Sequence, residues 1–535
     1  MVAVRADPGV ATERRSADPT DRRPAIVATV LAAALAVGYL VSPLIGQDTS
    51  AQLARANFAS AHPLTPVDLS WFGGTVQFGY SLWAPWLGGV VGMRLLGAIT
   101  AVLGAWLATR LLQRARPARP IWGGVAVAIC QVADVAEGRI TYQCGLVCAL
   151  AAVLAVLNGR RVAAVPLAFL AGAASPVVTL GLGIVAATAA LRRRFGDAVV
   201  LAGAGGLGSA IVAIVFADGA AMTFAPESAI RAVLATVLVI ALVPRRLGVV
   251  RIGAALNLAV IIAAWAVSSP VGSNAQRLSL LFAIPIIAAV VEWPGWLAAG
   301  AVVVAVLAQP PVMPDIARLA GAPVTHESYY QPVLRAIDRQ GTLTGRVEVP
   351  EINGHWDAAL LAKHVPLARG WLRQVDTELN NDVFFGNGPD EASYRSWLER
   401  NAVQYVAVPD AQLTKGGQRE KALLDGGLPY LRAVWSDEHW ALYAVQNPAP
   451  IVGAPARLVS SDAARIVVEA PGGTTALLRM RWFRWTTLGP ASSGCIADDH
   501  GQVRLHTDPG RGLVRYVISS SADPFKSAAA RGHCP

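Results

Sequence analysis

The chain has 535 residues, of which 54% are hydrophobic and only 15% are charged, whereas a typical soluble protein carries about a quarter charged residues. This deficit excludes an ordinary soluble protein, because the apolar residues concentrate between about residues 24 and 309. The formal net charge is +10, but the basic residues are nearly all arginines in short clusters, without the interleaved aromatic residues of a nucleic-acid surface. The composition therefore predicts an integral membrane protein and excludes nucleic acid as a partner.

The N-terminal residues 1–23 contain arginines and prolines without hydrophobic periodicity, which predicts a disordered cytoplasmic tail. No small-residue cleavage site follows the next apolar run, so we expect an uncleaved first span. A helix needs roughly 20 apolar residues to cross about 30 Å of hydrocarbon. By this criterion about eleven spans are expected, at residues 25–45, 86–110, 121–136, 141–157, 162–175, 177–191, 197–216, 229–244, 252–269, 278–291 and 296–309.

Arginine clusters predict the side of the membrane on which each loop lies. They fall in alternate loops, at residues 110–119, 160–161, 192–194 and 245–251. Because positive charges near span ends remain cytoplasmic, the N-terminus is expected inside. An odd number of spans then places the C-terminal part outside, in a multi-pass protein of the plasma or inner membrane. The last inner turn, at residues 292–295, lacks a basic residue.

The segment 162–191 is too long for one membrane span and too short for two spans of the usual length. We expect two short helices that turn at Ser175-Pro176, each reaching only about 21 Å at 1.5 Å per residue. Short helices are tolerated beside protein or a polar cavity. An outward-opening cavity and simple thinning of the membrane both fit this pattern.

The first outer loop, about residues 46–85, is much longer than a connection between two spans requires. Its polar and aromatic residues include Asp48, Arg55, His62, Asp68, Trp71 and Tyr80. A carboxylate at the membrane surface beside apolar groups can have a raised pKa and act as a general base, which is one interpretation of Asp48. Asp48 also precedes a helix-like stretch and would serve there as an N-cap, and the two roles can coexist.

More polar residues are expected on the same outer side. They are Arg94 near the end of the second span, Glu137 and Arg139 between the third and fourth spans, and Asn274 and Arg277 before the tenth. Ionisable groups at this depth are costly and are functional candidates. Several arginines near one carboxylate suit a phosphate or pyrophosphate group. Each arginine alone would equally pair with a neighbouring acid, as Arg139 would with Glu137.

Four features together resemble the GT-C superfamily of integral membrane glycosyltransferases: an acid opening a long first outer loop, about eleven spans, short central helices and an outward C-terminal domain. The stretches 48–55, 71–81 and 138–142 are similar to loops of uncharacterised bacterial members. The resemblance implies transfer of a sugar, with inversion, from a polyprenyl-phosphate donor to a cell-envelope glycan or glycolipid. Many members have an adjacent acidic pair in this loop, whereas here Gln47 precedes Asp48. A degenerate, inactive member of the superfamily is therefore an alternative.

On this hypothesis Asp48 is the catalytic base, while Asp68 and Glu137 shape the site. The expected substrate-binding residues are Arg55, His62, Trp71, Tyr80, Arg94, Arg139, Asn274 and Arg277, with Arg94, Arg139 and Arg277 as candidates for the lipid phosphate. No zinc or nucleotide-binding motif occurs, so no cofactor is predicted, and a divalent metal stays open. The rival hypotheses are a flippase or transporter of a lipid-linked sugar and a non-catalytic envelope-assembly protein.

The C-terminal part divides into two predicted units. Residues 310–450 alternate helical and strand patterns, with strands at 346–350 and 404–409 and a hairpin at 431–446, which indicates an α/β domain. Residues 451–535 show strand alternation with Gly and Pro turns, which indicates a β-sandwich-like module. The aromatic and charged segment 355–374 suits sugar binding or packing on the membrane domain. We expect a disulfide between Cys495 and Cys534, because disulfides persist outside the membrane.

Overall fold

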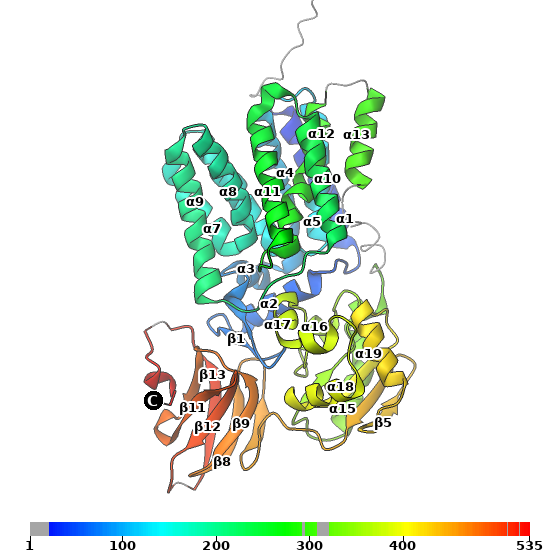
Figure 1. Cartoon of the computed structure of the whole chain (residues 1–535), viewed down its shortest axis with the longest axis vertical. Helices are drawn as coiled ribbons and strands as arrows, with labels where there is room; N and C mark the ends of the chain where they lie inside the picture. Colours follow the sequence, from blue (N-terminus) through cyan, green and yellow to red (C-terminus); the bar gives the residue numbers. More distant parts are fainter. Residues whose placement is uncertain (1–20, 292–294, 308–319, 511, 524, 535) are drawn as a thin grey trace, which may run out of the picture.

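The computed structural model describes residues 21–291, 295–307, 320–510, 512–523 and 525–534. The predictions for the tail before residue 21, for the inner turn at 292–294 and for the boundary near residue 310 lie outside these residues. A bundle of apolar helices forms one end of the molecule (Figure 1). An α/β unit and a β unit lie beside each other at the other end, and the loop after the first helix lies between them and the bundle.

Every predicted span falls on a helix of this bundle. The helices are Arg23–Val41 (α1), Ala84–Val91 (α3), Met93–Arg114 (α4), Pro120–Ala136 (α5), Ile140–Leu157 (α6), Arg161–Ala174 (α7), Pro176–Leu191 (α8), Phe195–Ala210 (α9), Pro226–Leu242 (α10), Gly248–Ala266 (α11), Arg277–Val290 (α12) and Gly295–Leu307 (α13). Within the described ranges, six helices are long and apolar enough to cross a membrane, and others are shorter apolar helices. The predicted span 86–110 comprises both α3 and α4, because Gly92 takes a φ of 90° and ends the first helix.

The two short central helices turn at the predicted position. Helix α7 has 14 residues and α8 has 16, and extended Ser175 joins them. Pro176 opens α8, where a missing N–H is tolerated. Helix α7 also packs closely on α9, since a Cβ atom on Gly172 would lie only 2.1 Å from a carbonyl oxygen of α9. Small residues are what allow such backbone contact between helices in a membrane.

The loop between α1 and α3, called the first loop below, is folded and contacts both the α/β unit and the β unit. It contains helix α2 (Thr49–Ala61), strands β1 (Val67–Asp68) and β2 (Thr75–Val76), and a 3-10 turn (Gln77–Gly79). Trp71 is 2% exposed and donates its indole N–H to the carbonyl of Ala358 in the α/β unit, at 3.0 Å. The backbone N–H of Leu69 donates to the carbonyl of Ala463 in the β unit, at 2.8 Å. The loop therefore connects all three parts of the molecule.

The α/β unit is a four-stranded sheet with helices packed around it. Its elements are a 3-10 turn (Pro323–Thr325), α15 (Glu327–Arg339), β3 (Arg346–Glu348), α16 (Asp357–Leu360), α17 (Arg373–Phe384), α18 (Glu391–Arg400), β4 (Val403–Pro409), α19 (Lys415–Asp425), β5 (Leu431–Ser436) and β6 (Trp440–Val445). The strand order is β3-β4-β6-β5, and only the β3–β4 pair is parallel. Strand β4 is almost wholly buried, as expected for a central strand. The strands predicted from the sequence fall on β3 to β6.

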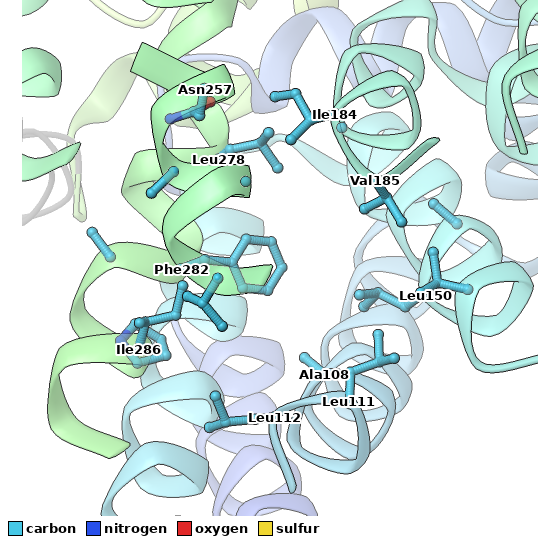
Figure 2. Close-up of a pocket in the computed structure, with 18 of the residues that line it drawn as sticks. Ala108, Leu111, Leu112, Leu150, Ile184, Val185, Asn257, Leu278, Phe282 and Ile286 are labelled. Atoms are coloured by element: carbon cyan, nitrogen blue, oxygen red, sulfur yellow. The ribbon is translucent and has the colours of Figure 1, made fainter. Parts of the chain in front are cut away.

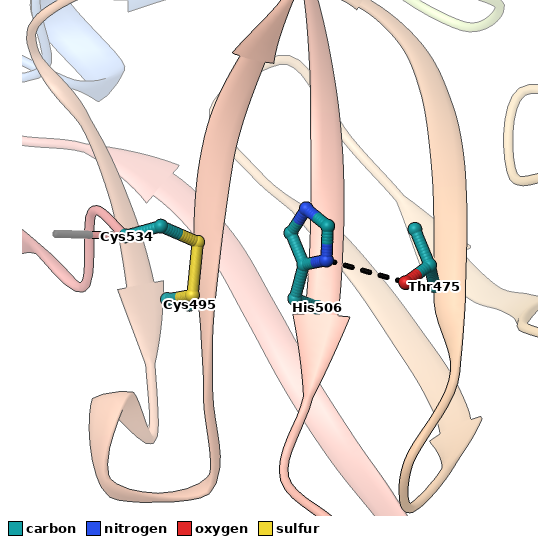
Figure 3. The surroundings of a disulfide bond; sticks show 4 residues. All are labelled: Thr475, Cys495, His506 and Cys534. Carbon is teal, nitrogen blue, oxygen red and sulfur yellow. Dashed lines mark hydrogen bonds between the residues drawn. A yellow bond between two sulfur atoms is a disulfide. The ribbon is translucent and has the colours of Figure 1, made fainter.

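The β unit contains two antiparallel sheets that enclose an apolar core. Its strands are β7 (Arg457–Ser461), β8 (Ile466–Pro471), β9 (Thr475–Arg481), β10 (Thr486–Gly489), β11 (Gly494–Asp499), β12 (Gln502–Thr507) and β13 (Leu513–Ser520). The sheet orders are β10-β13-β8-β7 and β11-β12-β9. Buried residues alternate along β8, which is the pattern of a sandwich face. A disulfide joins Cys495 on β11 to Cys534 near the C-terminus, the pair expected from the sequence (Figure 3).

Candidate functional site

One face of α2 meets the end of the helical bundle that lies nearest the α/β and β units. Asp48, Gln52 and Arg55 lie on this face, because they recur at the spacing of a helical turn. The hydroxyl of Thr141, on α6, donates a hydrogen bond to the side chain of Gln52. The guanidinium of Arg55 lies over the ring of Tyr80, 4.9 Å from its centroid. The face thus brings two charged residues of the first loop to the boundary of the bundle.

Two glycines allow the first loop to pack directly on the turn between α5 and α6. A Cβ atom on either Gly46 or Gly138 would lie 2.2 Å from a backbone atom of the opposite segment, and both residues have positive φ. Only glycine fits such a contact. The packing places Asp48 beside the turn that carries Glu137 and Arg139, and the Arg139 guanidinium interacts electrostatically with both carboxylates. The structure therefore brings these three predicted site residues together.

Arg139 forms an ion pair with Asp134 and also interacts electrostatically with Glu137, the neighbouring acid considered as its partner from the sequence. Arg139 Nη1 lies 3.1 Å from Asp134 Oδ1, and Gln143 Nε2 donates to Asp134 Oδ2 at 2.9 Å. Asp134 is 5% exposed and was not singled out from the sequence. Its signal was an acid inside a predicted span, five residues before an arginine.

Asp48 occupies the N-cap position of α2, but its side chain does not cap the helix. The capping interpretation is therefore wrong for the carboxylate. Asp48 is half-buried, and its carboxylate forms no hydrogen bond or ion pair with any other residue that the structure describes. A carboxylate without a hydrogen-bond or ion-pair partner among the described residues can accept a proton from a ligand.

Arg277 is a second boundary arginine, at the start of α12. It is 8% exposed, and its Nε donates to Asn274 Oδ1 at 2.9 Å. Its guanidinium lies over the ring of Tyr142 on α6, 5.0 Å from the centroid. Within the described parts of the chain its Nη1 has no hydrogen-bond partner. A buried donor without a partner is costly, so this atom is a candidate to bind a ligand.

A cavity of about 160 Å³ lies between the bundle and the α/β unit. Its polar lining residues are Arg55, Tyr80, Asp218, Asn274 and Gln374, and the first turn of α8 closes one side. The segment around Gln374, in the α/β unit, covers the cavity, and the Gln374 carbonyl accepts the N–H of Ala220 at 3.3 Å. The cavity lies at the turn between the two short helices, where an outward cavity was one of two expectations. The segment 355–374 thus packs on the membrane domain, at least through Gln374.

A larger apolar cavity of about 440 Å³ lies within the bundle (Figure 2). Figure 2 shows Leu278 and Phe282 of α12 facing Ile184 and Val185 of α8 across it. On α6 its lining runs from Tyr142 to Leu157, a length of about 22 Å at 1.5 Å per residue. Arg277 does not itself line this cavity, but it directly precedes Leu278 and contacts Tyr142, which do, so the buried arginine adjoins one end of the cavity.

Three predicted residues lie on the opposite side of α2. His62, Asp68 and Trp71 line a cavity of about 230 Å³ between α2, the rest of the first loop, the α/β unit and the β unit. Burial raises the pKa of Asp68 to about 6, against the hydrogen bonds from Ser70 and the charges of Arg55 and His62. The Ser70 N–H donates to Asp68 Oδ1 at 2.9 Å. The structure therefore separates these residues from the group around Asp48.

Arg94 lies apart from both groups. Its guanidinium donates to the carbonyls of Tyr39 and Ser42 and lies over the Tyr39 ring. Arg94 thus supplies hydrogen-bond donors to the carbonyl groups at the end of α1. It lines none of the cavities described above. Within the described ranges no group of three or more His, Cys, Asp or Glu residues is arranged to hold a metal ion.

The sequence matches no protein-family profile and no curated protein. Among solved structures, the chain is similar to the arabinofuranosyltransferase AftD from Mycobacteria, with 12% identity, a TM-score of 0.42, and coverage of 95% of this chain and 58% of that chain. A mutant form of the same enzyme gives 12% identity, a TM-score of 0.41, and coverage of 96% and 61%. The chain thus spans about three fifths of the length of that enzyme. A likeness this distant carries no functional argument, and function has to be argued from the side chains.

Proposed function

We propose that this chain is a membrane glycosyltransferase of the GT-C type, which transfers a sugar from a polyprenyl-phosphate donor to a cell-envelope glycan or glycolipid at the outer face. One observation carries the proposal. A long apolar cavity in the bundle is lined at one end by Tyr142 and Leu278, which adjoin a buried arginine with an unpartnered donor among the described residues, and Asp48 lies at the same end of the bundle without a hydrogen-bond or ion-pair partner among those residues. The apolar cavity suits a lipid tail and the arginine suits an anionic head group. The carboxylate of Asp48 suits the role of general base.

The apolar cavity is the binding site for the donor's polyprenyl chain. Among the described residues its lining contains no charged side chain, so an isoprenoid would replace contacts with lipid at little cost. The donor phosphate would lie at the outer end, where Arg277 Nη1 is unpartnered. Arg139 is a weaker candidate for the phosphate because Asp134 already neutralises it.

Asp48 is the general base in this proposal. Its carboxylate takes the proton of an acceptor hydroxyl, and the hydroxyl oxygen attacks the anomeric carbon of the sugar from the face opposite the phosphate. The bond from the anomeric carbon to the phosphate oxygen breaks with its electron pair, so polyprenyl phosphate leaves and the configuration inverts. The positive charge of Arg277 stabilises the leaving phosphate.

A flippase for a lipid-linked sugar would use the same cavity differently. Its polar head group would have to pass the apolar lining between Tyr142 and Leu157. No charged residue lines that path within the described residues, so passage of a phosphate would be costly. The geometry therefore favours transfer at the outer boundary over transport.

The test is sugar transfer in membranes that contain the full chain and a radiolabelled polyprenyl-phosphate sugar. Loss of a general base costs about 10²–10⁴-fold in rate, so Asp48→Asn should reduce transfer by about that factor while donor binding persists. Glu227→Gln is the matched control, since Glu227 is an exposed acid at the start of α10, paired with Arg231. Full transfer by the Asp48 variant would overturn the mechanism.

A further inference from the structure

Arg55 is a cation without a hydrogen-bonded counterion. Its guanidinium forms no hydrogen bond or ion pair with any residue that the structure describes, and its one ring contact is with Tyr80. Burial lowers the pKa of Arg55, and Tyr80, Asp218 and Asp68 oppose the shift. Desolvating a guanidinium without hydrogen bonds is costly, so Arg55 is a candidate to bind an anionic ligand.

The two carboxylates whose charges act on Arg55, Asp218 and Asp68, both form hydrogen bonds or ion pairs with other groups. Asp218, whose side chain is 2% exposed, lies 2.9 Å from Arg481 Nη2 and accepts the backbone N–H of Val76 at 2.6 Å. Asp68 accepts the N–H of Ser70. Asp218 lines the same cavity as Arg55, so it is the acid that would neutralise Arg55 if it were released.

Arg481 comes from the β unit and is held in a fixed position. It ends strand β9, its backbone N–H donates to the carbonyl of Gly73 at 2.9 Å, and its Nη1 donates to the carbonyl of Gly74 at 2.9 Å. The β unit therefore supplies the positive charge that pairs with Asp218 at the membrane boundary.

The same cavity has a second feature that favours an anion. The first turn of the 16-residue helix α8 lines it through Pro176 and Val177. Ser175 at the N-cap is 1% exposed, does not cap the helix, and its hydroxyl has no partner among the described residues. A helix N-terminus attracts negative charge through its free N–H groups.

We infer that the cavity beneath the α/β unit binds a phosphate group through Arg55, and that Arg481 of the β unit keeps Arg55 available to this ligand by pairing with Asp218. Identifying the phosphate as that of a lipid-linked sugar rests on the proposed function, whereas phosphate binding itself does not. Asn274 lines the cavity and bonds Arg277, so the phosphate would lie between Arg55 and Arg277. Arg481 is a positioning residue, since it acts through Asp218.

The experiment measures the affinity of the full chain, in detergent micelles, for polyprenyl monophosphate and for the uncharged polyprenol. The ratio of the two affinities is the phosphate preference. Arg55→Gln should reduce it about tenfold or more, the effect of one charge-assisted hydrogen bond. Arg481→Met should reduce it similarly, because Asp218 is then released to pair with Arg55. Arg481→Met combined with Asp218→Asn should restore the preference, and Arg481→Lys should keep most of it.

Arg484→Met is the matched control. Arg484 also extends from the β unit to the bundle, where it donates to the carbonyl of Val215, but it pairs with no carboxylate in the described part of the chain. An equal loss in this variant, or no recovery in the double variant, would show that Arg481 acts only by packing and would overturn the inference. An unchanged preference in Arg55→Gln would also overturn it. Thermal unfolding of each variant checks its fold, and Arg481→Lys with Asp218→Asn decides the question if Arg481→Met does not fold.

The outcomes separate this inference from the proposed function. If the variants behave as expected but the wild-type chain transfers no sugar, the phosphate site stands and the glycosyltransferase proposal fails. If the wild-type chain transfers sugar but Arg55→Gln keeps its phosphate preference, only the phosphate site fails.

Discussion

The guanidinium of Arg139 lies 3.1 Å from the carboxylate of Asp134, and the two side chains are only 18% and 3% exposed. This pair lies at the C-terminal end of α5, directly beside the segment that carries Asp48. Because both charges are largely shielded from water, each depends on the other.

Removing one partner of this pair should destabilise the bundle. Asp134→Asn removes the 3.1 Å ion-pair partner of Arg139 and leaves only the smaller attraction of Asp48 and Glu137, so it should cost up to about 3–5 kcal/mol, the range for a broken buried pair, whereas Asp134→Asn combined with Arg139→Gln should cost less. Thermal unfolding in detergent measures the difference. Glu227→Gln is the control, because the Glu227 side chain is 76% exposed and exposed pairs contribute at most about 1 kcal/mol. Equal midpoints for Asp134→Asn and the wild type would refute the structural role.

The apolar helices were predictable because long apolar runs indicate them, and the short α7 and α8 follow from arginines that bound a segment of intermediate length. Pairings were not predictable. Arg139 has acids two and five residues away, and only the turn geometry selects Asp134. The pairing of Arg481 with Asp218 joins residues far apart in the chain, which a single sequence cannot reveal.

The stability of the α/β unit should depend on Glu420. This residue is fully buried on α19, where it accepts the Tyr394 hydroxyl at 2.8 Å. Burial raises its pKa to about 7, against the attraction of Arg369. A carboxyl with a raised folded pKa gives stability that is fully present below its unfolded pKa, 4.5, and that is lost as the pH rises through about 7.

We therefore expect the unfolding midpoint of the wild type to fall relative to that of Glu420→Gln between pH 5 and pH 8. The slope of the difference is at most about 1.4 kcal/mol per pH unit for one proton. Comparison with the variant isolates Glu420 from His355, whose pKa burial lowers to about 3 and which acts in the opposite sense. Parallel pH profiles would contradict the prediction.

The disulfide should stabilise the β unit. Cys495 and Cys534 are 39 residues apart, and closing a loop of this length contributes about 4 kcal/mol in the chain-entropy account. Cys495→Ser combined with Cys534→Ser should lower the unfolding temperature of the β unit and leave the helical signal of the bundle unchanged. Cys148→Ala, in α6, is the control. A β unit of unchanged stability would show that the bond only restrains the chain end.

Filling the apolar cavity should block the lipid tail without disturbing the fold. Gly253 on α11 lines the cavity, and a Cβ atom there would meet only two atoms, each 4.0 Å away. Gly253→Phe therefore adds a ring into open space without a backbone clash, and it should weaken binding of polyprenyl phosphate about tenfold or more, because contacts along the tail supply most of the affinity.

Gly183→Phe is the matched control for this variant. Gly183 lies on α8 with nothing within 4 Å of an added Cβ atom, and it does not line the cavity, so binding should stay near the wild-type value. Inorganic phosphate should compete equally with the lipid in both variants, because the head-group residues are unchanged. If Gly253→Phe bound the lipid as tightly as Gly183→Phe, the tail would have to lie outside the bundle, along the lipid-facing surface. The apolar cavity would then lose its role, and Arg277 would have to receive the phosphate from the membrane side.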